Sequence, residues 1–178
     1  RIMKNSAVEK FNVTDLTENQ KQQLAKIEGF VQQQLQQSES SIAVIEGAAG
    51  TGKSVILTKL FEKLQTGAKN PTSPYYGLKN KFTVNHPELL KVYQELSTTI
   101  PSLKKGDYIR PTSLINQAHK NNQRYDVIVV DEGHLLLSKP EPYIRFTQDN
   151  QLSELIKLAK VVIVVFDFQQ VMQSKMFW

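Results

Sequence analysis

The sequence contains no cysteine among its 178 residues. It therefore forms no disulfide bond, no thiolate metal site and no cysteine nucleophile. A chain without cysteine fits a reducing compartment, and we expect a cytoplasmic location. Long hydrophobic runs are absent too. The longest, at residues 161–166, has the length of a strand and is far shorter than the roughly 18 residues that cross a bilayer, so we expect no membrane association.

Dense blocks of one charge are also missing. The net charge is +5, and the basic residues are spread along the chain. Such a balance is typical of an ordinary basic surface and of a surface that contacts a polyanion, and charge alone does not separate the two. The three histidines, His86, His119 and His134, lie in different segments. A histidine metal centre is therefore not expected.

The apolar residues that are present, 40% of the chain, suffice for the core of one domain. The first residues contain neither an initiator methionine in first place nor an apolar signal segment. We expect residues 1–15 to be an N-terminal extension and residues 16–178 to form one domain of a longer protein.

Helical and strand patterns alternate along that domain. Apolar spacing predicts a helix from about Thr17 to residue 35, where Thr17 and Gln20 can form a capping box. Further helices are expected at 54–64, 86–96, 112–120 and 152–159, strands at 42–46, 82–84, 107–109, 126–131 and 161–167, and loops at 66–81 and 138–150. The strands are continuously apolar. The pattern indicates an α/β sandwich of three layers with a mainly parallel central sheet.

The most specific motif is "GAAGTGKS", at residues 47–54. It fits the phosphate-loop pattern G-x-x-x-x-G-K-[ST], between an expected strand and an expected helix. The loop would turn backbone amides towards a phosphate chain, Lys53 would reach the β- and γ-phosphates, and Ser54 would hold Mg²⁺. The pattern predicts ATP and Mg²⁺ as ligands and does not exclude GTP. The expected nucleotide-binding residues are Gly47, Ala48, Ala49, Gly50, Thr51, Gly52, Lys53 and Ser54.

An acidic pair follows the strand "DVIVVD". Asp131 and Glu132 would lie at the carboxyl end of that strand, where open α/β sheets bind ligands. We expect Asp131 to bind Mg²⁺, through water, and Glu132 to polarise the attacking water. His134 has two interpretations, a half-buried turn residue or a residue that hydrogen-bonds across the site.

Glutamines mark two further segments. After the last strand, Asp167, Gln169 and Gln170 would approach the phosphate loop, where Gln170 could contact the γ-phosphate or the attacking water. The alternative is an ordinary polar loop. Near the start, Gln20 could pair with N6 and N7 of adenine through its amide, or could simply be part of a polar surface.

Together these segments resemble the first RecA-like domain of superfamily 1 DNA/RNA helicases. "LTENQ" looks like the adenine-reading Q motif, "GAAGTGKS" like motif I, "VVDEGH" like motif II and "FDFQQ" like motif III. The resemblance covers about residues 16–172 and points to bacterial helicase/ATP-binding proteins related to the Schlafen helicase-like region. Two residues depart from the usual motifs: Phe166 replaces the glycine of motif III, and Gly133 replaces the alanine of motif II.

The resemblance implies further contacts. Thr83, Asn85 and His86 match motif Ia, which touches single-stranded nucleic acid, and residues 110–116 would lie on the same face. A second RecA-like domain would follow Trp178 and supply an arginine finger. We therefore expect the ATP-binding half of a Mg²⁺-dependent, helicase-like ATPase that acts on DNA or RNA, with weak or no hydrolysis by this chain alone. Two alternatives are a P-loop NTPase with a regulatory or signalling role and a non-enzymatic, nucleotide-gated binding module.

Overall fold

The computed structural model describes residues 15–47, 52–136 and 150–167. Four phosphate-loop residues, Ala48, Ala49, Gly50 and Thr51, lie outside this part of the chain, as do Gln169 and Gln170 and most of the expected loop at 138–150. The expectations for those residues stay predictions.

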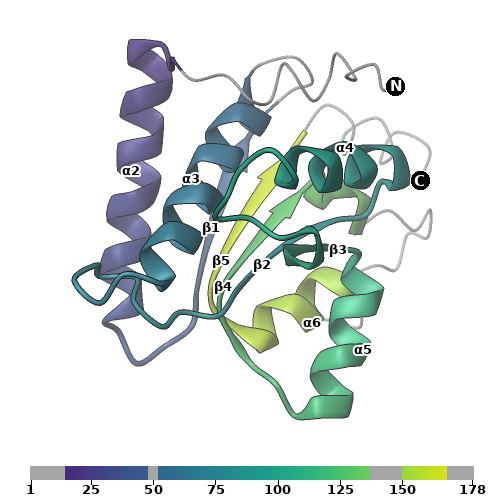
Figure 1. Cartoon of the computed structure of the whole chain (residues 1–178). Coiled ribbons are helices and arrows are strands. Elements are labelled where there is room, and N and C mark those ends of the chain that lie inside the picture. The colour runs from purple at the N-terminus through teal and green to yellow at the C-terminus, as the bar shows by residue number, and fades with distance from the viewer. Residues whose placement is uncertain (1–14, 48–51, 137–149, 168–178) are drawn as a thin grey trace.

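Five strands form one sheet in the order β1-β5-β4-β2-β3. Every neighbouring pair is parallel, so the strands in Figure 1 point the same way. The strands are β1 (Ser41–Glu46), β2 (Asn80–Val84), β3 (Tyr108–Ile109), β4 (Tyr125–Asp131) and β5 (Ala159–Phe166). This confirms the α/β class and the parallel sheet, and it places the carboxyl ends of β1, β5 and β4 side by side.

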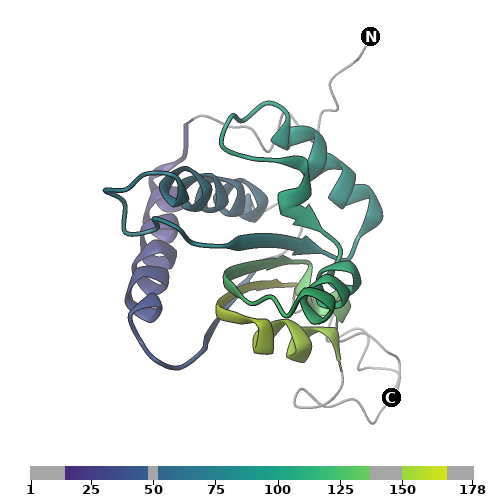
Figure 2. The same cartoon turned by 60° about the horizontal axis from the view of Figure 1, so that its bottom comes forward.

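Helices cover both faces of the sheet, as Figures 1 and 2 show. On one face, α2 (Glu18–Leu35), α3 (Lys53–Ala68) and α4 (Pro87–Ser97) share a core with the sheet. On the other face, α5 (Pro111–Asn121) and α6 (Gln151–Leu158) do so. Two 3-10 turns, η1 (Lys105–Asp107) and η2 (Gly133–Leu136), follow α4 and β4. The molecule therefore has the three layers that the sequence predicts.

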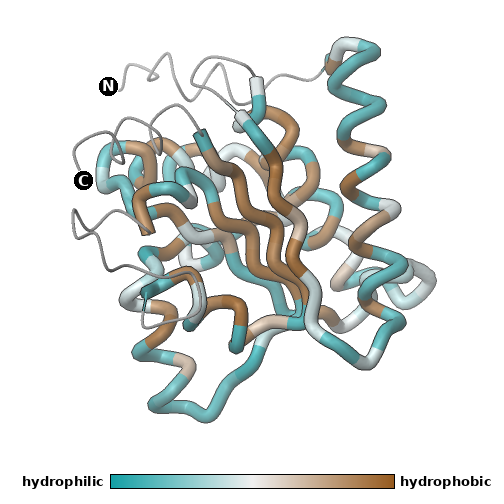
Figure 3. Tube along the Cα trace, turned by 180° about the vertical axis from the view of Figure 1, so that it is seen from behind, coloured by the Kyte–Doolittle hydropathy of each residue, from teal (hydrophilic) through white to brown (hydrophobic). Residues whose placement is uncertain are grey.

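The central strands are apolar on both sides because each side faces a different helical layer. Val127 and Val129 of β4 belong to the core under α2, α3 and α4, whereas Ile128 and Val130 belong to the core over α5 and α6. All four are fully buried. Figure 3 shows the resulting continuous apolar colour along the strands, which is typical of a parallel sheet between two layers.

The edge strand β1 is covered on one face only. Ala43 and Ile45 pack against the core under α2 and α3. Ile42 and Val44 point the other way and keep 40% and 53% of their surface exposed. The alternating burial of β1 shows that one of its faces is open, and among the described strands β1 lies at the border of the sheet.

The predicted starts of the helices agree with the structure more closely than their predicted ends. The Thr17 hydroxyl accepts from the Gln20 amide N–H at 3.1 Å, and Gln20 Oε1 accepts from the Thr17 N–H at 2.9 Å, which confirms the capping box. Pro87 is the first residue of α4, a position that suits proline because the first helical N–H has no partner within the helix. The loop expected at 66–81 is shorter, since α3 continues to Ala68 and β2 begins at Asn80. Tertiary contacts support this extension: the Asn80 side chain donates to Gln65 Oε1 at 3.0 Å.

Among the helices in the described ranges, none is long and apolar enough to span a bilayer.

Candidate nucleotide site

The expected site residues meet at the carboxyl edge of the sheet. Gly47 follows β1, and its N–H donates to the Phe166 carbonyl at 2.8 Å, which ties the start of the phosphate loop to the end of β5. Asp131 is the last residue of β4, and Asp167 directly follows β5. Because the strands are parallel, residues distant in sequence come to one edge, where α/β sheets bind ligands.

Both described glycines of the phosphate loop lie where a side chain would not fit. Gly52 has a φ of 80°, in the left-handed region that favours glycine. A Cβ on Gly52 would lie 2.8 Å from the Gln20 Nε2. A Cβ on Gly47 would lie 2.6 Å from Lys53 Cγ. The loop ends are therefore packed tightly against the side chains that flank them.

The N-terminus of α3 has no side-chain cap. Gly52 occupies the capping position and provides no hydrogen bond from a side chain. The first amides of a helix lack partners within the helix, so this end can bind an anion such as a phosphate. Lys53, the first residue of α3, donates from Nζ to Gln23 Oε1 at 2.7 Å. The lysine expected to reach the phosphates is thus held by a glutamine of α2.

Asp131 is buried, with 5% of its surface exposed. Its Oδ2 accepts from the Tyr93 hydroxyl at 2.6 Å, and its Oδ1 accepts from the Glu132 N–H at 2.9 Å. Burial raises the pKa of Asp131 to about 6, although the hydrogen bond from Tyr93 acts in the opposite direction. Burial also raises the pKa of Tyr93 well above its ordinary value, with the nearby Asp131 carboxylate adding to the shift, so the phenol remains the donor.

Glu132 adopts an unusual backbone conformation, with a φ of 53°. A positive φ at a residue other than glycine costs on the order of 1 kcal/mol and is concentrated at functional sites. The turn is held by the Glu132 N–H bond to Asp131 and by the Leu135 N–H, which donates to the Glu132 carbonyl at 3.0 Å. Burial raises the pKa of Glu132, and His86 opposes this shift.

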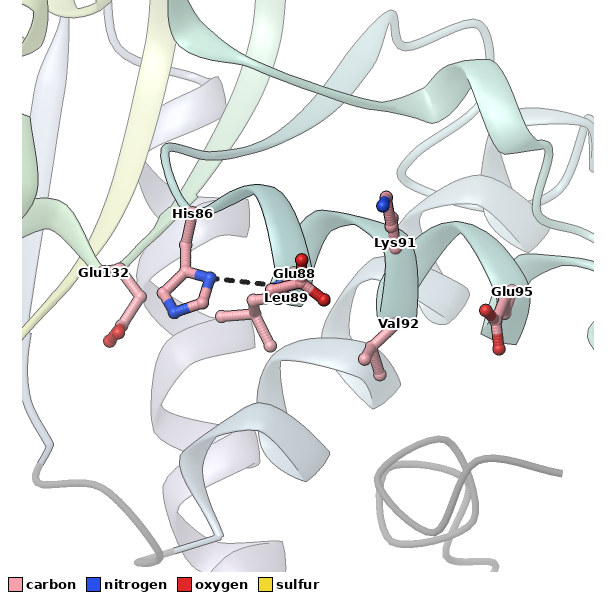
Figure 4. Close-up of a pocket in the computed structure, with 7 residues that line it drawn as sticks. All are labelled: His86, Glu88, Leu89, Lys91, Val92, Glu95 and Glu132. Atoms are coloured by element: carbon pink, nitrogen blue, oxygen red, sulfur yellow. Dashed lines mark hydrogen bonds between the residues drawn. The ribbon is translucent and has the colours of Figure 1, made fainter.

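A groove of about 420 Å³ opens beside Glu132 (Figure 4). The His86 ring lies between Glu132 and Leu89 in this view. His86 Nδ1 accepts from the Leu89 N–H at 3.1 Å and so caps α4. The neutral ring therefore carries its proton on Nε2, the other nitrogen. The groove is lined by His86, Glu88, Leu89, Lys91, Val92, Glu95 and Glu132.

His134 joins the expected motifs II and III. It is buried, with 4% of its surface exposed, and its Nδ1 accepts from the Asp167 N–H at 3.1 Å. This hydrogen bond supports the second interpretation of His134, a residue that connects two parts of the site, over a half-buried turn residue. Gln170 lies outside the described residues, so its role stays a prediction.

The two departures from the usual motifs fit each other. A Cβ on Gly133 would lie 2.8 Å from Cε1 of Phe166 and would also collide with Val164. The ring of Phe166 therefore occupies the space that an alanine at position 133 would need. Val164, which provides the nearest atom, and the bulky Phe166 together leave no room for a side chain at position 133.

The described oxygen donors fit Mg²⁺. Asp131 accepts from the Tyr93 hydroxyl, and Ser54, the second residue of α3, influences the pKa of the same hydroxyl, so both expected ligands are neighbours of Tyr93. Within the described ranges, no group of three or more histidine, cysteine or acidic side chains could hold a metal. Mg²⁺ commonly uses one or two protein oxygens and takes the rest from water and phosphates. One carboxylate and one hydroxyl suit that pattern.

One expected nucleic-acid contact is wrong. Thr83 is fully buried within β2, and its hydroxyl donates to the Val129 carbonyl at 3.3 Å. The Thr83 side chain has no access to solvent because both faces of β2 are covered. Asn85 and His86, beyond the end of β2, are partly exposed. In the segment 110–116, Pro111 and Leu114 are buried, whereas Arg110 and Thr112 are exposed.

Two site residues were missed from the sequence, Gln23 and Tyr93. Gln23 is three residues after Gln20 and so lies on the same side of α2. Tyr93 lies on the buried side of α4 with Val92 and Leu96. A tyrosine among apolar helix positions indicates a hydroxyl that needs a buried partner, but the sequence does not name the partner.

Comparisons with known proteins identify relatives of this chain. The family described as Schlafen group 3, DNA/RNA helicase domain, matches residues 40–178. A Saccharomyces cerevisiae protein, the uncharacterized YPL245W, is 35% identical over 99% of this chain, which covers 41% of that protein. The origin recognition complex subunit 1 of Plasmodium falciparum is 23% identical over 86% of this chain and 12% of its own length. The chain thus spans less than half of either relative.

Among solved structures, the Aeropyrum pernix ORC2 protein, in ADPNP-ADP complexes, has a TM-score of 0.48 and 13% identity, over 94% of this chain and 48% of that one. The family match extends over most of the chain and contains β1, the phosphate loop, the acidic pair and β5. With its parallel sheet and P-loop arrangement, the chain belongs to the Schlafen group 3 DNA/RNA helicase domain family.

Proposed function

We propose that this chain is the ATP-binding half of a Mg²⁺-dependent, helicase-like ATPase that acts on DNA or RNA. The observation that carries the proposal is the meeting, at the carboxyl edge of the parallel sheet, of the uncapped start of α3, which bears Lys53 and Ser54, with Asp131 at the end of β4. That meeting provides a positive helix end, a lysine and two hard oxygen ligands in one place. Membership of a DNA/RNA helicase domain family supports the same proposal.

Each residue has a role in the proposed reaction. The amides of residues 47–54, together with Lys53, would bind the phosphates, and Gln20 would contact the adenine. Ser54 and Asp131 would hold Mg²⁺, which neutralises phosphate charge when bound. Glu132, beside the groove, would orient or deprotonate the attacking water, and its raised pKa is in keeping with an acid–base role. Gln170 would respond to the γ-phosphate. Nucleic acid would contact Asn85 and His86.

The test uses the full-length parent protein, because we expect a second α/β domain to supply further catalytic groups. Glu132→Gln should lower ATP turnover by about 10² or more, the usual contribution of a general base, and leave nucleotide binding intact. Lys53→Ala should weaken nucleotide binding itself. Glu95→Gln is the matched control, because it removes an exposed carboxylate from the same groove and should retain turnover.

Single-stranded DNA and RNA are then added to the wild-type protein. A rise in ATP turnover with either strand would support the helicase-like function. ATP turnover that does not change with any added DNA or RNA would favour a regulatory P-loop NTPase instead. Nucleotide binding with no turnover in the wild type, with or without strands, would contradict the ATPase proposal and favour a nucleotide-gated binding module.

A further inference from the structure

Tyr93 occupies a position that neither the family match nor the expected motifs assign. It is fully buried on α4, in the core that α4 shares with α3 and β4. Its hydroxyl donates to Asp131 Oδ2 at 2.6 Å, and the Ser54 side chain is among the polar neighbours that influence the pKa of Tyr93. This hydroxyl therefore contacts Asp131 of β4, with Ser54 of α3 as a neighbour.

The Tyr93 ring is fixed by an aromatic cluster. It stacks on Tyr108, with ring centroids 5.4 Å apart and planes 8° apart. It also contacts Phe82 of β2, with centroids 4.5 Å apart. A ring held from two sides cannot swing its hydroxyl to another place without disturbing the core. The hydroxyl is thus a fixed donor for the Asp131 carboxylate.

The Asp131 carboxylate is consequently held by both of its oxygens. Tyr93 donates to Oδ2, and the Glu132 N–H donates to Oδ1. Two donors from different elements fix the rotation of the carboxylate group. Each carboxylate oxygen can accept more than one hydrogen bond or ligand, so these contacts leave acceptor capacity for a metal ion or its water.

We propose that Tyr93 is a positioning residue for the Mg²⁺ site: its hydroxyl orients Asp131 for the metal. This inference rests on the proposed nucleotide-binding function. Groups that orient metal ligands from outside the first coordination shell change metal affinity by about 10-fold to 100-fold when they are removed. Tyr93 also belongs to α4, the helix that His86 caps beside Glu132. A residue of α4 therefore contacts the Asp131 carboxylate, and the residue that caps α4 lines the same groove as Glu132.

The chain offers a closely matched control in Tyr108. Tyr108 lies in the same aromatic cluster and has 1% of its surface exposed. Within the described residues, its hydroxyl makes no hydrogen bond. Tyr93→Phe and Tyr108→Phe each remove one buried hydroxyl and retain the ring, but only the first removes a contact to Asp131. A general effect of losing a buried hydroxyl would appear in both variants.

The experiment measures binding of a slowly hydrolysed ATP analogue to the 178-residue chain by calorimetry, with increasing Mg²⁺ and with EDTA. For Tyr93→Phe we expect a rise of about 10-fold in the Mg²⁺ concentration that gives half of the Mg²⁺-dependent change in analogue affinity. The affinity for the analogue in EDTA should stay at the wild-type value. Tyr108→Phe should match the wild type in both quantities. Unfolding temperatures are recorded for all three proteins. Mn²⁺ binding in the presence of ADP, followed by electron paramagnetic resonance, provides a second readout on the folded fraction.

Three results would overturn the inference: an unchanged or lower Mg²⁺ requirement in Tyr93→Phe, an equal change in Tyr108→Phe, or a loss of affinity in EDTA that accounts for the whole effect. If the wild type binds no nucleotide under any condition, the proposed function falls together with this inference. If the wild type binds nucleotide with Mg²⁺ and Tyr93→Phe behaves in the same way, only the role of Tyr93 is overturned.

Discussion

At the residue scale, Asp131 combines deep burial with a charge that the proposed function requires. Its pKa of about 6 in the folded chain exceeds the ordinary value of 3.8, so the folded state binds the proton more tightly than the unfolded state. The stability that this proton contributes is fully present below about pH 4 and is lost as pH rises through about 6. At neutral pH the ligand-free chain therefore carries an unfavourable buried charge.

We predict that Asp131→Asn stabilises the ligand-free chain at neutral pH. The pKa difference corresponds to about 3 kcal/mol at most. The advantage of the variant over the wild type should grow as pH rises from about 4 to 7, and urea unfolding at several pH values measures it. Asn retains an acceptor for the Glu132 N–H, and the Tyr93 hydroxyl can accept from the amide. An advantage that does not vary with pH would contradict the predicted pKa of Asp131.

Gly133 is a second residue whose identity is set by its neighbours. An alanine there would meet Phe166 at 2.8 Å and collide with Val164, although the backbone of Gly133 does not have a positive φ. We predict that Gly133→Ala destabilises the chain by about 1–3 kcal/mol through overpacking. Chemical denaturation measures the loss of unfolding free energy.

Two further variants test the steric reason. Val164→Ala removes the nearest clashing atom, so the double variant should be more stable than the sum of the single effects, by about 0.5 kcal/mol or more. Gly29→Ala, within α2, places a methyl group where no atom lies within 4 Å and should stabilise by about 0.5–1 kcal/mol. Equal effects at positions 29 and 133 would show that crowding by Phe166 and Val164 is not the cause.

At the element scale, α4 depends on the side chain that begins it. The His86 ring accepts from the Leu89 N–H, one of the amides that an α-helix leaves without a partner. The same ring lies beside Glu132 in the groove. His86 therefore both caps α4 and lines the groove beside Glu132.

We predict that His86→Ala lowers the unfolding free energy by about 1 kcal/mol, because the cap is lost, whereas His86→Asn retains most of the stability, since asparagine is a good N-cap. Thermal unfolding of the wild type, His86→Ala and His86→Asn measures these differences in stability. In the full-length ATPase, both variants should change the pH dependence of turnover, because both remove the imidazole beside Glu132. Equal stability of the Ala and Asn variants would argue against the capping role.

At the scale of the whole molecule, a ligand that joins α2, α3 and β4 should stabilise the fold as a unit. Binding of ATP with Mg²⁺ at about 100 times its dissociation constant adds about 2.7 kcal/mol to the unfolding free energy. For a chain of 178 residues this corresponds to a rise of about 5–10 °C in melting temperature.

Differential scanning fluorimetry of the 178-residue chain with ATP and Mg²⁺ tests this expectation. The shift should disappear in Lys53→Ala and should shrink when Mg²⁺ is chelated. The same titration with GTP measures the base preference, which the phosphate loop does not decide. A wild-type chain that shows no shift with any nucleotide would contradict the proposed site. A cytoplasmic location and a second α/β domain beyond Trp178 stay predictions.

The sequence by itself determined the features that depend on short-range chemistry. Apolar strands alternating with amphipathic helices imposed the three layers, and the Thr17 capping box and Pro87 set two helix starts. The motif at residues 47–54 and the acidic pair at the end of β4 predict two halves of one candidate site, because parallel strands end at one edge.

Tertiary structure alone decided how these pieces meet. The burial of Thr83, the pairing of Lys53 with Gln23, the fit of Gly133 to Phe166 and the contact of Tyr93 with Asp131 each depend on residues many positions apart. Periodicity reports which side of a helix or strand is buried, but not which residue of another element lies opposite. That information arises only when strand order and packing bring distant segments together, and the metal site depends on it most.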